Sequence, residues 1–334
     1  MKQLLAYCLS IILCVSFTGC MENYLDLYPE DKITSASFPE NESDIKLLLN
    51  GVYAQLREKE VYNQGLFGFG ITDGATPNAF NWGTDEVFNK LGAGRLSSSD
   101  GGVVTYRWKR CYEIISRANY LLACMDLVDL SEEAKAKYSG ETHFLRGLAY
   151  SVLAETYGGV PIILTNISTE EARSLKRASL EETWQQALDD YEVAITNLGV
   201  DAPEPGRATK GAALGMKMRA YLYQGKYKEV LSCVEQIDAL KKYGLFHSYE
   251  GLFDPANENN KEVLFDIQYI EGENSQGSYI DQYCGTGTGS WTRGSRYVPT
   301  DDLVAAYETI DGSPVDPENP LSLIHISEPT RLLS

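Results

Sequence analysis

Apolar positions recur at helical spacing along most of the chain, most clearly in the stretch that ends at Pro161. Ser131, followed by two glutamates, offers a cap oxygen at the start of this stretch. Gly158 and Gly159 precede Pro161, which cannot continue a helix. The pattern therefore predicts one long helix that ends at Gly158, with short apolar segments packed on both sides of it. Its apolar face is expected to carry Leu145, Leu148, Val152 and Thr156, widened by Ala149 and Leu153.

Five further stretches repeat the helical pattern, so the chain is predicted to be mainly α-helical. They cover residues 41–59, 103–127, 179–199, 209–224 and 227–241. Ser179 and Glu182 form a capping box at the start of the third stretch. The last two stretches, joined by Gly225 and Lys226, resemble a tetratricopeptide hairpin, in which small residues let two helices approach. Residues 260–268 are expected to form a short strand or an extended segment.

The composition narrows the possible partners and sites. A net charge of −18 excludes nucleic acid as a partner, because no basic surface remains to neutralise phosphates. The sequence has no C-x-x-C pair and its three histidines are scattered, so no metal site is expected. It also lacks nucleotide-loop, hydrolase and metalloprotease motifs, and no cofactor is expected. Cys111, Cys124 and Cys233 fall in helical patterns and are predicted to be buried thiols rather than disulfides.

The N-terminal residues are typical of a targeting segment. Lys2 precedes an apolar run, Leu4–Phe17, which is too short for a stable membrane span. Small residues then lead to Cys20 in a sequence that resembles a lipobox. We expect residues 1–19 to be a lipoprotein signal peptide and the Cys20 thiol to carry the lipid that anchors the protein. The alternative is an ordinary secretory signal that is cleaved near Gly19.

The helical pattern stops between Val61 and Asp100, where glycines, polar residues and several aromatic residues form a long irregular stretch. Loops of this length are usually functional or disordered, and the aromatic content argues against simple disorder. An aromatic ring can stack on the apolar face of a sugar while amide and carboxylate groups bond its hydroxyls. Alternatively, the rings pack the loop against the helices. The candidate ligand-binding residues in this stretch are Asp73, Asn78, Phe80, Asn81 and Trp82.

Several motifs resemble those of SusD/RagB-family lipoproteins of Bacteroidetes. The central one is E-x-x-F-L-R-x-L-A-Y-x-x-L-x-x-x-Y-G-G-V-P at residues 141–161. Further matches lie at Leu49–Leu56, Trp108–Asn119, Arg207–Ala213, Asn260–Gln268 and Val298–Gly312. The resemblance implies a SusD-like helical fold with tetratricopeptide-like hairpins, whose long irregular loops carry the binding site. It also implies a surface lipoprotein of the outer membrane that binds oligosaccharides or polysaccharides and delivers them to a SusC-like TonB-dependent transporter.

The resemblance extends to a second irregular stretch, Ser275–Pro299, which in that family lies near the glycan. It adds the candidates Tyr283, Trp291, Arg293 and Tyr297, again with packing as the alternative. The matched region, residues 20–320, is expected to be one SusD-like domain that lacks the family's C-terminal region. Residues 321–334 match nothing in the family pattern and are expected to be a non-native tail, with an ordinary apolar tail as the alternative.

Two other functions are open at this level. A tetratricopeptide-type scaffold would bind only protein, through the concave face of its helices. A surface glycoside hydrolase would need two carboxylates at a suitable separation, such as Asp73 with Glu86 or Asp281. Any acidic chain offers such carboxylate pairs, so the prediction is a binding protein and not an enzyme.

Overall fold

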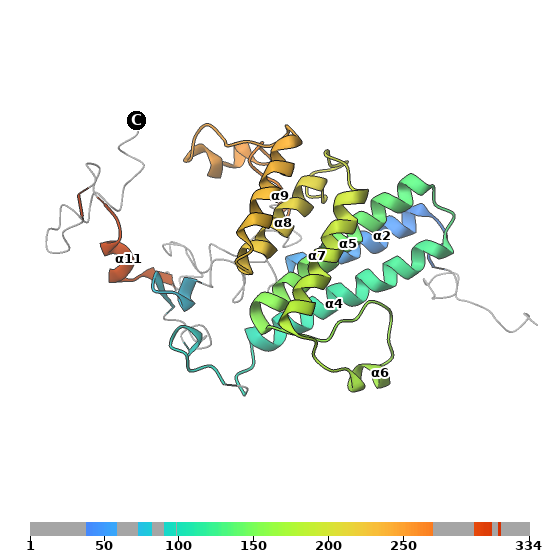
Figure 1. Ribbon diagram of the computed structural model, residues 1–334, viewed down its shortest axis with the longest axis horizontal. Coiled ribbons are helices and arrows are strands. Elements are labelled where there is room, and N and C mark those ends of the chain that lie inside the picture. Colours follow the sequence, from blue (N-terminus) through green and yellow to red (C-terminus); the bar gives the residue numbers. More distant parts are fainter. Residues whose placement is uncertain are drawn as a thin grey trace, which may run out of the picture.

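The computed structural model describes residues 38–58, 73–81, 90–97, 99–269, 297–308 and 313–314. Their fold is mainly helical, as predicted, and Figure 1 shows the long helices packed beside one another. The helices are α2 (Glu42–Tyr53), α4 (Val103–Cys124), α5 (Glu132–Tyr157), α6 (Thr169–Ser174), α7 (Leu180–Asn197), α8 (Lys210–Tyr223), α9 (Tyr227–Ala239) and α11 (Asp301–Ala305). Short 3-10 turns are η1 (Ala54–Arg57), η3 (Met125–Leu127), η4 (Gly251–Phe253) and η5 (Pro255–Asn257), and the strands are β1 (Ala79–Asn81) and β2 (Tyr297–Pro299).

Helix α5 begins and ends where the sequence predicts. The Ser131 hydroxyl accepts a hydrogen bond from the Ala134 amide at 3.2 Å, which satisfies one of the free N–H groups of the first turn. Gly158 ends the helix with a φ of 74°, a conformation that residues with a Cβ rarely adopt. A Cβ at Gly159 would lie 2.0 Å from the carbonyl oxygen of Ala178. The two glycines therefore serve different needs, one of conformation and one of space.

Helix α5 lies at the centre of the bundle, in contact with α2, α4 and α7. Of the predicted apolar face, Leu145, Leu148, Ala149 and Leu153 are buried, whereas Val152 is half-buried and Thr156 is exposed. Polar residues of the same helix are buried as well, Glu141 and Arg146 among them. Because neighbours cover α5 on several sides, its burial extends around the helix and is not limited to one stripe.

The buried Arg146 joins three helices. Its Nε and Nη2 donate to the Asp190 carboxylate of α7 at 3.0 and 2.7 Å, and its Nη1 donates to Asn119 Oδ1 of α4 at 2.8 Å. Asn119 in turn donates to the carbonyl of Ile163 at 2.9 Å. A buried charge is tolerated only when it is paired and hydrogen-bonded. This network therefore fixes how α4, α5 and α7 align.

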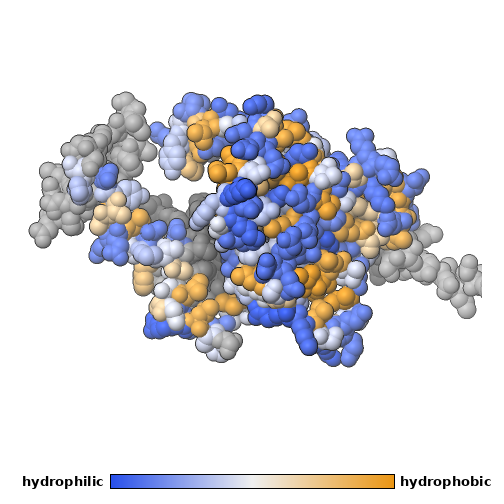
Figure 2. All heavy atoms as spheres, in the orientation of Figure 1, coloured by the Kyte–Doolittle hydropathy of each residue, from blue (hydrophilic) through white to orange (hydrophobic). Residues whose placement is uncertain are grey.

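Helices α7, α8 and α9 follow α5 in sequence, and each packs against the next. Ser179 and Glu182 form the predicted capping box at the start of α7, which then packs against α8. Helices α8 and α9 form the predicted hairpin, with Gly225 at a φ of 70° in the turn. Leu222 and Leu231 of this pair are exposed. Figure 2 shows apolar and polar residues intermixed over the face of the molecule that it draws.

One missed helix and two predictions concern segments around these helices. Helix α6 was not predicted, although Ser168 and Glu171 form a capping box there too. No strand is assigned to residues 260–268, which instead have a turn at 261–262, a bend at 264 and no regular structure from 265 onward. Cys111, Cys124 and Cys233 are buried free thiols, as predicted. In the part of the chain that the structure describes, no helix has the length and apolar character needed to cross a bilayer.

Candidate functional site

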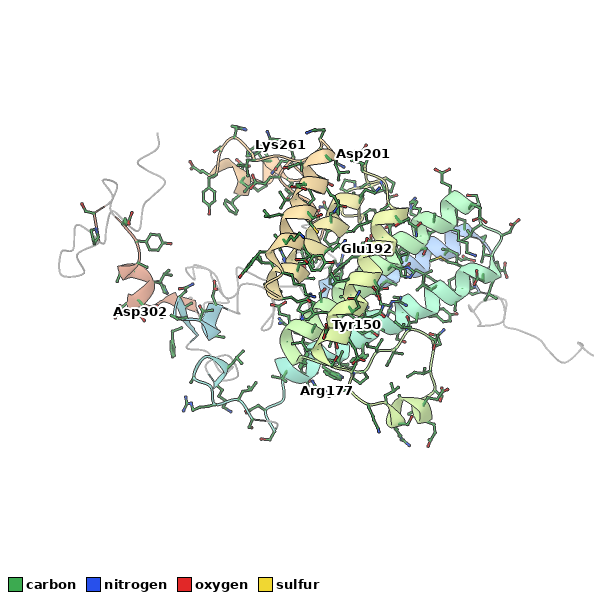
Figure 3. All side chains as sticks on the ribbon, viewed as in Figure 1. Tyr150, Arg177, Glu192, Asp201, Lys261 and Asp302 are labelled. Carbon is green, nitrogen blue, oxygen red and sulfur yellow. The ribbon has the colours of Figure 1, made fainter. Side chains whose placement is uncertain are left out.

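The two irregular stretches meet in a small antiparallel sheet. Strand β1 belongs to the first stretch and β2 to the second, and they pair with Phe80 opposite Val298. The same register sets Asn81 opposite Tyr297, so that two residues predicted independently as ligand-binding become neighbours. Figure 1 shows this sheet and α11 to one side of the helices, and Figure 3 likewise shows Asp302 of α11 apart from Tyr150 in the bundle.

Pro299 fits the hydrogen-bond pattern of this sheet. The Thr300 amide donates to the Asn78 carbonyl at 3.1 Å, so Asn78 and Thr300 continue the strand register at a hydrogen-bonded position. Hydrogen-bonded and non-bonded pairs alternate in an antiparallel ladder. The next pair, Ala79 and Pro299, therefore occupies a non-bonded position, where a proline without an N–H group removes no ladder bond.

A compact turn leads into β1 and carries two of the predicted residues. The Thr76 amide and hydroxyl both donate to the Asp73 carbonyl, at 2.9 and 2.8 Å. The Asn78 amide then donates to the Thr76 hydroxyl oxygen at 3.1 Å. Asp73 and Asn78 are exposed, and half of the Phe80 side chain is accessible. The segment therefore presents an aromatic ring, a carboxylate and an amide to solvent within a few residues.

The other predicted residues are placed only in part. Asn81 and Tyr297 are located by their backbones as register partners. Trp82, Tyr283, Trp291 and Arg293 lie outside the described residues, as do Cys20, the segments 1–19 and 321–334, and the carboxylates of Glu86 and Asp281. For these residues the sequence predictions stand as predictions. Within the described residues, no group of three or more His, Cys, Asp or Glu side chains is arranged to hold a metal ion.

The segment that follows β1 toward α4 is held by an ion pair. Lys90 Nζ lies 2.9 Å from Asp100 Oδ1, and the Ser97 amide donates to Asp100 Oδ2 at 2.7 Å. The hydrogen bond from Lys90 and those from Ser97 lower the pKa of Asp100 to about 2. The loop that contains β1 therefore rejoins the bundle through a defined structure.

Several motif residues that carry the family resemblance build the interior rather than a binding surface. The Tyr53 hydroxyl donates to Glu141 Oε2 at 2.7 Å, and Arg207 Nη1 lies 3.4 Å from the same oxygen. Burial raises the pKa of Glu141 despite these two favourable contacts. Arg207 also donates to Asn50 Oδ1 at 2.6 Å. This cluster joins α2 to α5 and to the turn before α8.

Trp108 also belongs to the interior, as predicted. It is partly buried against the core, and its ring centroid lies 5.1 Å from that of Tyr112 and 5.2 Å from that of Tyr157. This aromatic cluster packs α4 against the end of α5. Of the four tryptophans, Trp108 and Trp184 are therefore structural, and Trp82 and Trp291 are the two left as candidates for ligand contact.

The structure also contains a cavity that the sequence did not predict. Its volume is about 830 Å³, and it lies between α8 and the irregular segment 262–269. Apolar side chains dominate the lining, among them Met216, Leu252, Phe253 and Leu264. Asp73, Asn78 and Phe80, the predicted ligand-binding residues whose side chains the structure describes, do not line it. No periodicity marks such a cavity, because it forms between a helix and an irregular segment that are distant in sequence.

Comparison with known proteins gives the fold a family context. Residues 23–222 match a family described as SusD-like, starch-binding and associating with the outer membrane. The chain belongs to the SusD-like family. This confirms the resemblance drawn from the motifs, and it also agrees with the prediction of a non-enzymatic protein, since SusD-like relatives are described as binding carbohydrate.

The relatives of this SusD-like chain extend the comparison. It is 26% identical over 321 residues to SusD-like protein P25 of Formosa agariphila, covering 89% of this chain and 58% of the relative. A SusD-like carbohydrate-binding protein of Bacteroides fragilis is 27% identical with a TM-score of 0.72, covering 84% of this chain and 55% of that one. Surface glycan-binding protein A of Bacteroides fluxus, at 22% identity and a TM-score of 0.61, covers 70% of this chain and 52% of its own and supports the fold alone. The chain thus spans little more than half the length of these relatives.

Proposed function

We propose that the protein is a glycan-binding lipoprotein of the outer membrane. It holds oligosaccharides or polysaccharides at the cell surface and delivers them to a SusC-like TonB-dependent transporter. The family is described as starch-binding and associated with the outer membrane, which supports this assignment. The 27% identical protein of Bacteroides fragilis is named as carbohydrate-binding. The observation that carries the proposal is the β1–β2 sheet, because it joins the two stretches that were selected from sequence as the glycan-binding loops.

Binding at this surface needs no chemical step. The exposed part of the Phe80 ring offers an apolar face on which a pyranose can stack, and Asp73 and Asn78 offer partners for its hydroxyl groups. Trp82 and Trp291 flank the two strands in sequence and are proposed to extend the aromatic platform. A wet, polar site of this kind favours a hydrated ligand over an apolar one.

In this proposal, the lipid anchor at the N-terminus holds the protein at the outer membrane. The Cys20 thiol carries the lipid, the acidic residues after it form a tether, and the folded region faces the outside. Incorporation of radiolabelled palmitate in a Bacteroides host tests this directly. Labelling of the wild type and its loss in Cys20→Ser are the expected results, and equal labelling of the two proteins would remove the anchor from the proposal.

Glycan binding is tested by electrophoresis of the chain from residue 20 onward, with Cys20→Ser, in native gels cast with polysaccharide. Soluble starch, laminarin, xylan, yeast mannan and mucin glycans form the panel. We expect retardation by at least one polysaccharide. Phe80→Ala, Trp82→Ala and Trp291→Ala should each weaken it by about 1–3 kcal/mol, by analogy with the stacking of bases on aromatic side chains.

A control variant and two alternative outcomes separate this function from a protein scaffold and from a hydrolase. Tyr227→Ala removes an aromatic ring that is 67% exposed on α9, in the helical hairpin, and should leave glycan binding unchanged. A protein-binding scaffold would instead show no retardation by any polysaccharide. Release of reducing ends from the retained polysaccharide would indicate a hydrolase and contradict the proposal.

A further inference from the structure

Thr300 connects the two halves of the candidate site. It follows β2 directly and is the N-cap of α11. Its amide donates to the Asn78 carbonyl at 3.1 Å, and its hydroxyl donates to the neighbouring carbonyl of Pro77. The same hydroxyl oxygen accepts the Leu303 amide at 3.2 Å. Thr300 therefore bonds to two carbonyls directly before β1 and to the first turn of the helix that follows it.

The hydrogen bonds of Thr300 reach the residues directly before β1, where they can hold the two strands in register. Pro77 and Asn78 lie at the end of the turn that Thr76 closes and directly before β1. The paired strands are only three residues long, and a two-stranded sheet of this size is marginally stable by itself in water. The bonds from Thr300 therefore form a large part of what keeps β1 in register with β2.

We propose that Thr300 is a positioning residue for glycan binding. Its hydroxyl group holds residues 73–81 against β2, so that Asp73, Asn78 and Phe80 are presented together beside this strand. Thr300 does not itself contact the ligand in this proposal, which rests on the proposed function. The role requires a hydroxyl group that donates across to Pro77 while accepting from α11, and serine is the other residue that meets this requirement with a similarly short side chain.

Three variants of the chain from residue 20 onward, with Cys20→Ser, test the role. Thr300→Val keeps the branched shape and removes both hydroxyl bonds, whereas Thr300→Ser keeps the hydroxyl. Ser168→Ala is the matched control, because it removes a hydroxyl cap from the similarly short helix α6. The probe is the polysaccharide from the panel that retards the wild type most, and the measured quantity is its dissociation constant from the gel titration.

We expect Thr300→Val to weaken binding about tenfold, the size of effect that the loss of one to two net hydrogen bonds produces. Thr300→Ser should bind within about twofold of the wild type, as should Ser168→Ala. Serine would also restore a loss of stability that comes from the missing cap of α11, so the exchange experiment below separates a local loosening of the strands from a general loss of stability. Equal binding by Thr300→Val and the wild type would overturn the proposal, and so would a failure of Thr300→Ser to restore binding.

Amide hydrogen exchange provides a readout that needs no glycan. In Thr300→Val, exchange should accelerate in peptides that cover residues 78–81 and 297–304 and stay unchanged in α4, α5 and α7. Unchanged exchange at both strands would overturn the positioning role even if binding fell. If no polysaccharide retards the wild type, the proposed function fails together with the role in binding, and the exchange data still show whether Thr300 links the strands.

Discussion

The pair formed by Arg146 and Asp190 should dominate the response of the bundle to a single substitution. The side chains are 6% and 2% exposed, and the carboxylate accepts from both Nε and Nη2 of the guanidinium. Asp190→Ala leaves the arginine buried without its counter-charge, for which the typical cost is about 3–5 kcal/mol. Native domains are stable by only about 5–15 kcal/mol, so this is a large fraction of the total. The midpoint of thermal unfolding should fall by roughly 6–20 °C.

The assay is urea unfolding followed by circular dichroism, with the midpoint and slope fitted for each variant. Asp189→Ala is the matched control, since Asp189 is the adjacent residue but is exposed, and it should change stability by less than about 0.5 kcal/mol. The double variant Arg146→Met, Asp190→Leu should recover most of the loss, because apolar side chains of similar volume leave no buried charge. If Asp190→Ala costs no more than Asp189→Ala, or the double variant stays as unstable as the single one, the reasoning is refuted.

Other predictions concern the pKa values of two carboxyl groups and the effect of a side chain at the two glycines that end α5. Burial raises the pKa of Glu141 above its usual 4.5. The free energy of unfolding should therefore fall as the pH rises from the pKa of Glu141 in the unfolded chain to its pKa in the folded protein. Urea titrations at several pH values should show this fall in the wild type and not in Glu141→Gln. Lys90→Met should move the pKa of Asp100 from about 2 toward 3.8 in a carbon-13 NMR titration, because it removes the hydrogen bond from Lys90 that lowers this pKa most. The stability that the pair contributes is present above pH 3.8 and is lost as the pH falls toward 2. Gly158→Ala should cost about 1–3 kcal/mol through its positive φ. Gly159→Ala should cost more in thermal unfolding, because its Cβ would meet the Ala178 carbonyl.

The helices were predictable because their signals are local. Ser131 and Ser179 are capping residues immediately before apolar periodic stretches, and both helices begin at the next residue. Helix α6 has the same signal at Ser168 but was not predicted, since six residues are too few for a periodic apolar face. The partners of Arg146 could not be predicted, because nothing in the sequence distinguishes Asp190 from the exposed Asp189 except its place on the buried face of α7.

Composition was enough to select the candidate binding residues, but it could not predict how they are arranged in space. Aromatic and polar residues in two glycine-containing stretches marked Phe80 and Tyr297 as candidates, but no local signal sets Asn81 opposite Tyr297. Thr300 was noted only as part of a motif, and its hydroxyl was assigned no role. Its sequence context, a threonine followed by two aspartates and a leucine, is a readable cap signature that would have indicated α11. The carbonyl that it bonds across the sheet has no sequence signature.

The pairing of β1 with β2 also sets an order of assembly for the chain. The Thr300 hydroxyl and the Pro77 carbonyl are 223 residues apart in sequence. Every helix from α2 to α9 is therefore synthesised before the second strand exists, and domains generally fold from their N-terminal part first. Once those helices have folded, they shorten the loop that must close, which reduces the entropy cost of joining the strands. A chain interrupted before residue 297 could not form the sheet, so the proposed binding surface depends on residues that are synthesised after all of these helices.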